Sequence, residues 1–113
     1  MKLAIIGSRT IRVDSLDAYV TGADEIVSGG AKGVDCCAAE YAKRNGLKLT
    51  EFLPQYERYG RAAPIVRNQE IVQYADEVVA FWDGHSKGTL SAIRFAQKMG
   101  KPCNIIICEK ADG

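Results

Sequence analysis

The sequence predicts an α/β fold with three layers, in which one parallel sheet of five strands lies between two layers of helices. Short apolar runs alternate with stretches of helical apolar spacing, and this alternation is typical of parallel strands joined by right-handed crossovers. Residues 4–6, 78–81 and 105–107 carry apolar side chains only, as expected for strands that helices cover on both faces. With 113 residues, the chain 1–113 is expected to form a single domain.

The first half of the chain contains three of the expected strands and two of the expected helices. Residues 2–6 are an apolar run that ends at a glycine, and residues 14–20 have helical character. Residues 25–27 are a second apolar run, followed by Ser-Gly-Gly. Residues 34–44 carry an apolar stripe at helical spacing and end before Asn-Gly, a common helix stop. Residues 47–53 read as the third strand, which ends at a proline.

The second half continues the same alternation. Residues 55–61 are polar and aromatic and are expected to form a loop. A helix is expected over 63–75, because the proline near its start is acceptable in a first helical turn. Residues 77–82 read as a strand and residues 86–99 as a helix closed by a glycine. The apolar run 102–108 is expected to be the last strand.

Composition and charge exclude several classes of protein. Hydrophobic residues make up 47% of the chain, far more than a disordered chain contains. The net charge of +1 gives no general attraction to DNA or to anionic membranes. No apolar stretch approaches the roughly 18 to 20 residues that span a bilayer. The apolar run near the N-terminus is too short for a secretory signal, so we expect a cytoplasmic protein.

The cysteines do not form a metal-binding pattern. Cys36, Cys37, Cys103 and Cys108 include no C-x-x-C pair, and His85 is the single histidine. We therefore expect no metal and no cofactor, and interpret the cysteines as small buried thiols in a reducing compartment.

Ligands of open parallel sheets bind beyond the carboxyl ends of the strands, and three strand-to-helix junctions carry suitable residues there. The first junction is Gly7-Ser8-Arg9. A glycine lets the backbone approach a ligand, a serine donates a hydroxyl and an arginine offers a forked cation. The alternative is an ordinary strand exit with a surface arginine.

The second junction, residues 28–35 (SGGAKGVD), is rich in glycine and leads directly into a helix. Free backbone N–H groups and the helix dipole both favour a phosphate at such a place. Asp35 would either complement the dipole or accept hydrogen bonds from ribose hydroxyls. The loop is no Walker A motif but is close to G-x-G-x-x-G, with Ser28 in the first position. Glu51, eighteen residues after Gly33, resembles the ribose-binding acid of a dinucleotide fold.

The third junction, residues 83–89 (DGHSKGT), again places glycines and hydroxyls between a strand and a helix. Ser86 is also a plausible helix N-cap, which would be a purely structural role. Two such loops at one sheet edge, with Gly7-Ser8-Arg9 beside them, favour a ligand site.

The fourth junction is the loop 55–61, which leads toward Arg67 and Asn68. The tyrosines of this loop could stack on a base and its arginines could bind phosphate, or the loop could simply be solvated. Asn68 falls on the apolar stripe of the following helix. A polar side chain that faces inward needs a partner, here a neighbouring loop or a ligand.

These motifs together resemble the SLOG superfamily, which includes the DNA-processing protein DprA and the LOG-type proteins. The resemblance extends over residues 2–108 and is carried by Gly7-Ser8-Arg9, residues 28–35, Tyr59-Gly60, Arg67-Asn68 and residues 80–89. It implies a Rossmann-like sheet of order 3-2-1-4-5, a homodimer, and a pocket for a nucleotide or nucleotide-derived ligand.

We therefore interpret the chain as a nucleotide-binding domain that senses or sequesters its ligand. The expected ligand-binding residues, from the motifs and the resemblance, are Gly7, Ser8, Arg9, Ser28, Gly29, Gly30, Ala31, Gly33, Asp35, Arg67, Asn68, Asp83, Gly84, Ser86, Gly88 and Thr89.

One departure from the LOG-type pattern bears on catalysis. LOG enzymes cleave the N-glycosidic bond of nucleoside 5′-monophosphates with a Gly-Thr-x-x-Glu motif, and here Ala92 stands in the place of that glutamate. Asp35 and Asp83 are the candidates to replace the missing carboxylate. A LOG-like phosphoribohydrolase, a DprA-like module for single-stranded DNA and a dinucleotide-binding domain remain the alternatives.

Overall fold

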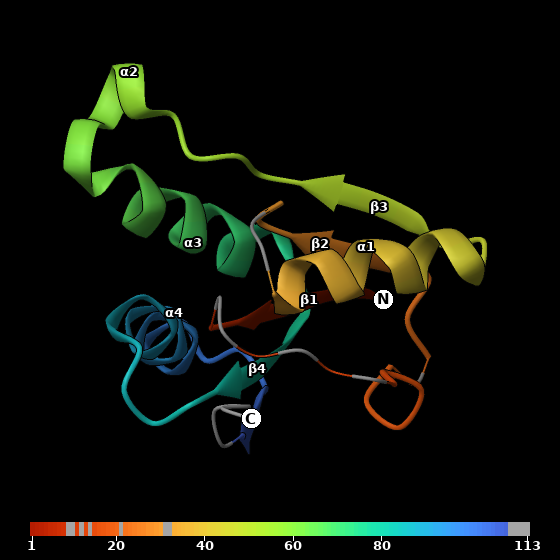
Figure 1. The fold of residues 1–113 in the computed structure, drawn as a ribbon. Coiled ribbons are helices and arrows are strands. Elements are labelled where there is room, and N and C mark those ends of the chain that lie inside the picture. Colours follow the sequence, from red (N-terminus) through yellow and green to blue (C-terminus); the bar gives the residue numbers. More distant parts are fainter. Residues whose placement is uncertain (9–10, 12, 14, 21, 31–32, 109–113) are drawn as a thin grey trace.

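The computed structural model describes residues 1–8, 11, 13, 15–20, 22–30 and 33–108, without the side chain of Asp35. Five parallel strands form one sheet in the order β3-β2-β1-β4-β5 (Figure 1). The strands are β1 (Lys2–Gly7), β2 (Glu25–Ser28), β3 (Lys48–Glu51), β4 (Glu77–Trp82) and β5 (Cys103–Ile107). The helices are α1 (Val34–Arg44), α2 (Tyr56–Tyr59), the 3₁₀ helix η1 (Gly60–Ala62), α3 (Ala63–Tyr74) and α4 (Lys87–Lys98). The predicted parallel sheet and its strand order are confirmed.

The central strand β1 is buried on both faces, which gives the fold its three layers. Leu3 and Ile5 pack on one face in a cluster that includes residues of α1. Ala4 and Ile6 point to the opposite face, into a cluster built with α3 and α4. The apolar run at the start of the chain is therefore explained by burial on both sides, as predicted.

The interval 14–20 does not form the predicted helix. Asp14 lies outside the described residues, and residues 15–20 make one turn, in which the N–H groups of Tyr19 and Val20 both donate to the Leu16 carbonyl. Leu16 is buried in the core together with Ile11. A stretch this short cannot support a helix by its own propensity. Its place on the sheet is fixed by burial of these two side chains.

The end of the sheet and the fourth junction also differ from expectation. Ile105 and Ile107 in β5 are exposed, although the sequence predicts burial on both faces. β5 is an edge strand, so within the described chain helices cover it less completely than the central strands. The expected loop 55–61 contains α2 and most of η1, and no residue of either short helix is buried. In Figure 1, α2 stands away from the sheet at the end of the connection from β3.

Gly7 allows α1 to start directly against the end of β1. A Cβ atom at this position would lie 2.5 Å from Cγ2 of Val34 and 2.9 Å from the carbonyl oxygen of Phe81. Val34 is the first residue of α1 and is fully buried. The absence of a side chain at residue 7 therefore sets the distance between the central strand and the start of this helix.

We expect Gly7→Ala to lower the free energy of unfolding by about 1–3 kcal/mol, because the added methyl group overpacks the contact between β1 and α1. Gly88→Ala is the matched control, since a Cβ atom there would meet nothing within 4 Å and the residue is helical. The control should be neutral or stabilising by about 0.5–1 kcal/mol. Urea unfolding followed by circular dichroism measures both, and equal stability of Gly7→Ala and wild type would contradict the close-approach explanation.

Candidate ligand site

Three of the predicted junctions meet at one edge of the sheet. The strands are parallel, and Gly7 pairs with Phe81 near the carboxyl ends of β1 and β4, while Ser28 pairs with Glu51 at the ends of β2 and β3. The loops 28–33 and 83–89 therefore flank the residues that follow β1. Arg9 and Ala31 lie outside the described residues, as does the side chain of Asp35.

The N-terminus of α1 is open toward this edge. Gly33 is its N-cap residue, and among the described residues no side chain caps the helix. Gly30 and Gly33 have φ values of 69° and 74°, a left-handed conformation that glycine adopts without strain. The N–H groups of Cys36 and Cys37 both donate to the Gly33 carbonyl. The N–H groups that precede them, together with the helix dipole, favour an anion at this point.

Ser8 places a buried hydroxyl beside the start of α1. It follows the glycine that touches Val34, and its side chain is 3% exposed. Its backbone N–H donates to the Phe81 carbonyl, but within the described chain its Oγ has no hydrogen-bond partner. A buried hydroxyl without a partner is costly, and such groups are rare in folded proteins. Ser8 is therefore a candidate donor to a ligand at the same edge, and its contact with a ligand stays a prediction.

Arg67 and Asn68 of α3 link the two glycine-containing loops. Arg67 is 8% exposed; its Nη1 donates to the Gly29 carbonyl at 2.8 Å and its Nε donates to Oδ1 of Asn68 at 2.9 Å. The amide nitrogen of Asn68 donates in turn to the Gly88 carbonyl at 3.4 Å. The partner of Asn68 is therefore the backbone of the first turn of α4, which follows the glycine-containing loop. These contacts make Arg67 a positioning residue for the loop after β2, and its predicted contact with a phosphate stays a prediction.

The loop 83–89 satisfies many of its own donors. Oδ1 of Asp83 accepts from the N–H groups of His85 at 2.8 Å and Ser86 at 2.7 Å. Ser86 caps α4 by accepting from the N–H of Thr89, which confirms the structural role weighed for it. The hydrogen bonds from His85 and Ser86 lower the pKa of the Asp83 carboxyl. Asp83 is thus held ionised as an acceptor within its own loop.

The tyrosines and arginines of the fourth junction are arranged unequally. Tyr56 is exposed on α2, whereas the guanidinium carbon of Arg58 lies 5.1 Å from the centre of the Tyr59 ring. One face of Tyr59 is therefore already covered by a cation. A base could stack most readily on Tyr56.

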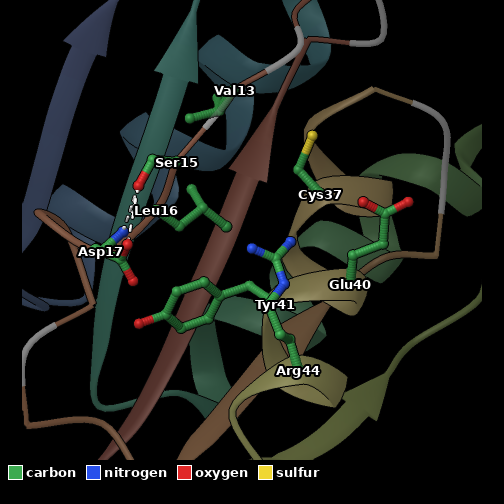
Figure 2. A pocket seen from close by; sticks show the side chains of 8 residues that line it. All are labelled: Val13, Ser15, Leu16, Asp17, Cys37, Glu40, Tyr41 and Arg44. Carbon is green, nitrogen blue, oxygen red and sulfur yellow. Dashed lines mark hydrogen bonds between the residues drawn. The ribbon is translucent and has the colours of Figure 1, made fainter.

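A separate cavity lies on the face of the sheet that α1 covers (Figure 2). Its volume is about 130 Å³. Burial, and next the charge of Asp17, raise the pKa of Tyr41 in its wall. None of the predicted site residues that the structure describes lines this cavity, whose described walls are formed by Val13, Ser15, Leu16, Asp17, Cys37, Glu40, Tyr41 and Arg44.

The expectation of buried thiols is wrong for Cys36, which is exposed on α1, and the other three cysteines are only partly buried. Cys36 lies on the side of α1 that faces away from the sheet, next to the inward-facing Val34 and Ala38. In the described part of the chain, no three histidine, cysteine, aspartate or glutamate side chains gather as metal ligands would. No described helix is long and apolar enough to cross a membrane.

We expect Arg67→Lys to lower the free energy of unfolding by about 1.5–3 kcal/mol, because an ammonium group cannot hold both Gly29 and Asn68 in the way that the planar guanidinium does. Arg94→Lys is the control, since Arg94 is exposed on α4 and should change stability by less than about 0.5 kcal/mol. Urea unfolding measures both variants. If both changes have the same small effect, Arg67 does not fix the loop.

Comparison with known proteins identifies the family. The model of the YspA, cpYpsA-related SLOG family matches residues 2–59, which include Gly7, Ser8 and the loop 28–33. The Gene 61 protein of Mycobacterium phage D29 is 39% identical over 83 residues, which cover 68% of this chain and 66% of the length of that relative. No solved structure matches significantly. With a parallel 3-2-1-4-5 sheet and this match over half of its length, the chain belongs to the YspA, cpYpsA-related SLOG family.

Proposed function

We propose that this protein binds a nucleotide or nucleotide-derived ligand at the carboxyl edge of its sheet, and that it senses or sequesters that ligand. Membership of the SLOG family suggests nucleotide-related ligand binding in general. The observation that carries the proposal is that the N-terminus of α1, capped by no described side chain, lies at the same edge of the sheet as the buried hydroxyl of Ser8, which has no partner in the described chain. Both features supply hydrogen-bond donors to one anionic group.

The phosphate group of the ligand is assigned to the loop 28–33. Arg67 supports this assignment, because its guanidinium donates from α3 to the Gly29 carbonyl and so holds the loop in place. The positive charge of its guanidinium also favours an anion nearby. The loop 83–89 already binds its own amides through Asp83 and Ser86, so we assign it to the ligand's other groups. Asp35 is proposed to accept hydrogen bonds from ribose hydroxyls.

The homodimer implied by the resemblance and the cytoplasmic location expected from the sequence belong to the same proposal. Single-stranded DNA is the weaker alternative, because a DNA-binding module would be expected to be basic and the net charge is +1.

Ser8→Ala separates a ligand-binding role from a structural one. We expect the variant to bind nucleotides at least about tenfold more weakly, because a hydrogen bond to a charged phosphate is lost. Its stability should be unchanged or higher, because an unpartnered buried hydroxyl is removed. Ser15→Ala, at an exposed position away from this edge, is the control for both measurements. Calorimetric titration with AMP, GMP, CMP and UMP tests this, and unchanged affinity for each bound nucleotide would place the phosphate elsewhere.

We also expect negligible release of free base from these nucleotides, even where they bind. Ala92 is 1% exposed and packs in the core cluster of α3 and α4. The position of the LOG-type glutamate therefore carries no carboxylate, and one positioned acid–base group contributes roughly 10²–10⁴ in rate. Chromatography after long incubation at high protein concentration measures the product. Multiple turnovers that Asp35→Asn abolishes would instead establish an N-glycosidase.

A further inference from the structure

Two side chains from the end of β3 form the rim of the loop to which we assign the phosphate. A Cβ atom built on Gly30 would lie 3.1 Å from Oε2 of Glu51 and 2.6 Å from Cδ2 of Leu53. Glu51 is the last residue of β3, and its register partner is Ser28. Both side chains are exposed, so they are accessible to whatever lies on the loop.

Glu51 is not used by the described fold. Within the described residues, its carboxylate makes no hydrogen bond or ion pair. Glu25, on the neighbouring strand β2, differs clearly: it accepts from the hydroxyls of Tyr74 and Thr50, which lower its pKa. The carboxylate of Glu51 can thus accept hydrogen bonds from a ligand, whereas the carboxylate of Glu25 already accepts them from the protein.

A carboxylate beside an anion site disfavours a bare phosphate by charge repulsion. It favours a ligand that brings hydroxyl donors close to its phosphate, because a carboxylate only accepts hydrogen bonds. The vicinal hydroxyls of a ribose are donors of this kind. In dinucleotide-binding folds, an acid near the end of the strand next to the glycine-rich loop binds the ribose hydroxyl, and Glu51 has the same relation to the loop 28–33.

We propose that Glu51 is a specificity-determining residue, which accepts hydrogen bonds from the 2′- and 3′-hydroxyls of a ribonucleotide while Leu53 contacts an apolar face of the same ligand. This inference rests on the proposed function. It adds that the site selects ribonucleotides over deoxyribonucleotides, and rejects nucleotides that carry a second phosphate on the ribose.

The test compares wild type with Glu51→Gln and with the control Glu77→Gln, an exposed glutamate at the opposite end of the sheet. Calorimetric titrations use the four ribonucleoside 5′-monophosphates, their 2′,3′-dideoxy counterparts and inorganic phosphate. Glu51→Gln should weaken ribonucleotide binding about tenfold and leave dideoxynucleotide binding unchanged or slightly tighter, because only the ribose donors lose a charged acceptor while phosphate repulsion is relieved for both. Phosphate should bind equally or more tightly, and Glu77→Gln should behave as wild type.

The outcomes distinguish this inference from the proposed function. If wild type binds nucleotides but Glu51→Gln alters ribo and dideoxy affinities equally, or alters neither, the selectivity role fails and the nucleotide site stands. If Glu51→Gln binds every nucleotide more tightly than wild type does, Glu51 only repels the phosphate and does not bind the ribose. If wild type binds none of the eight nucleotides and no phosphate, both proposals fail.

Discussion

The candidate site depends on one buried cation. The guanidinium of Arg67 reaches from α3 to the Gly29 carbonyl, and its Nε engages Asn68, whose amide reaches the start of α4. Loops rich in glycine gain conformational freedom in the unfolded chain, so they need such fixed points to keep one shape. Removal of Arg67 would leave buried acceptors without a donor, which costs more than the same loss at the surface. The two loops are therefore parts of one bonded unit with α3.

The fold could be predicted largely from hydrophobic periodicity. The apolar run of β1 is explained by its central place, with Leu3 and Ala4 on opposite faces. Burial on both faces leaves a clear signal, because the consecutive residues 3–6 of the strand are all apolar. Residues 14–20 gave a misleading signal for the converse reason: two buried side chains, Ile11 and Leu16, hold an irregular chain in place without regular hydrogen bonding. The exposure of Ile107 could likewise not be predicted from its apolar sequence run, because it depends on which elements pack against the edge strand β5.

The meeting of the loops was predictable from sequence, and their individual contacts were not. Glycines and hydroxyls follow several strands, and the topology of a parallel sheet brings these strand ends together at one edge. Only the structure shows which loop binds its own amide groups. Asp83 reads from sequence as a ligand or catalytic carboxylate, but its Oδ1 accepts two amides of its own loop. Leu53 was not among the predicted site residues, and it becomes a candidate only because a Cβ atom built on Gly30 would lie 2.6 Å from its Cδ2.

The contrast between the two helix N-termini supports a site with one principal anion position. α4 has a serine cap that accepts from its own third amide, so a ligand phosphate there would compete with an existing bond. α1 has a glycine at the same position, which has no side chain to accept from the first amides of the helix. A ligand held by its phosphate at α1 would then present its sugar toward Glu51 and its remaining surface toward the loop 83–89. Recognition of the ligand beyond its phosphate would therefore depend on hydrogen-bond acceptors of the protein. Such acceptors distinguish one ligand from another by the hydroxyl and amine donors that each ligand carries.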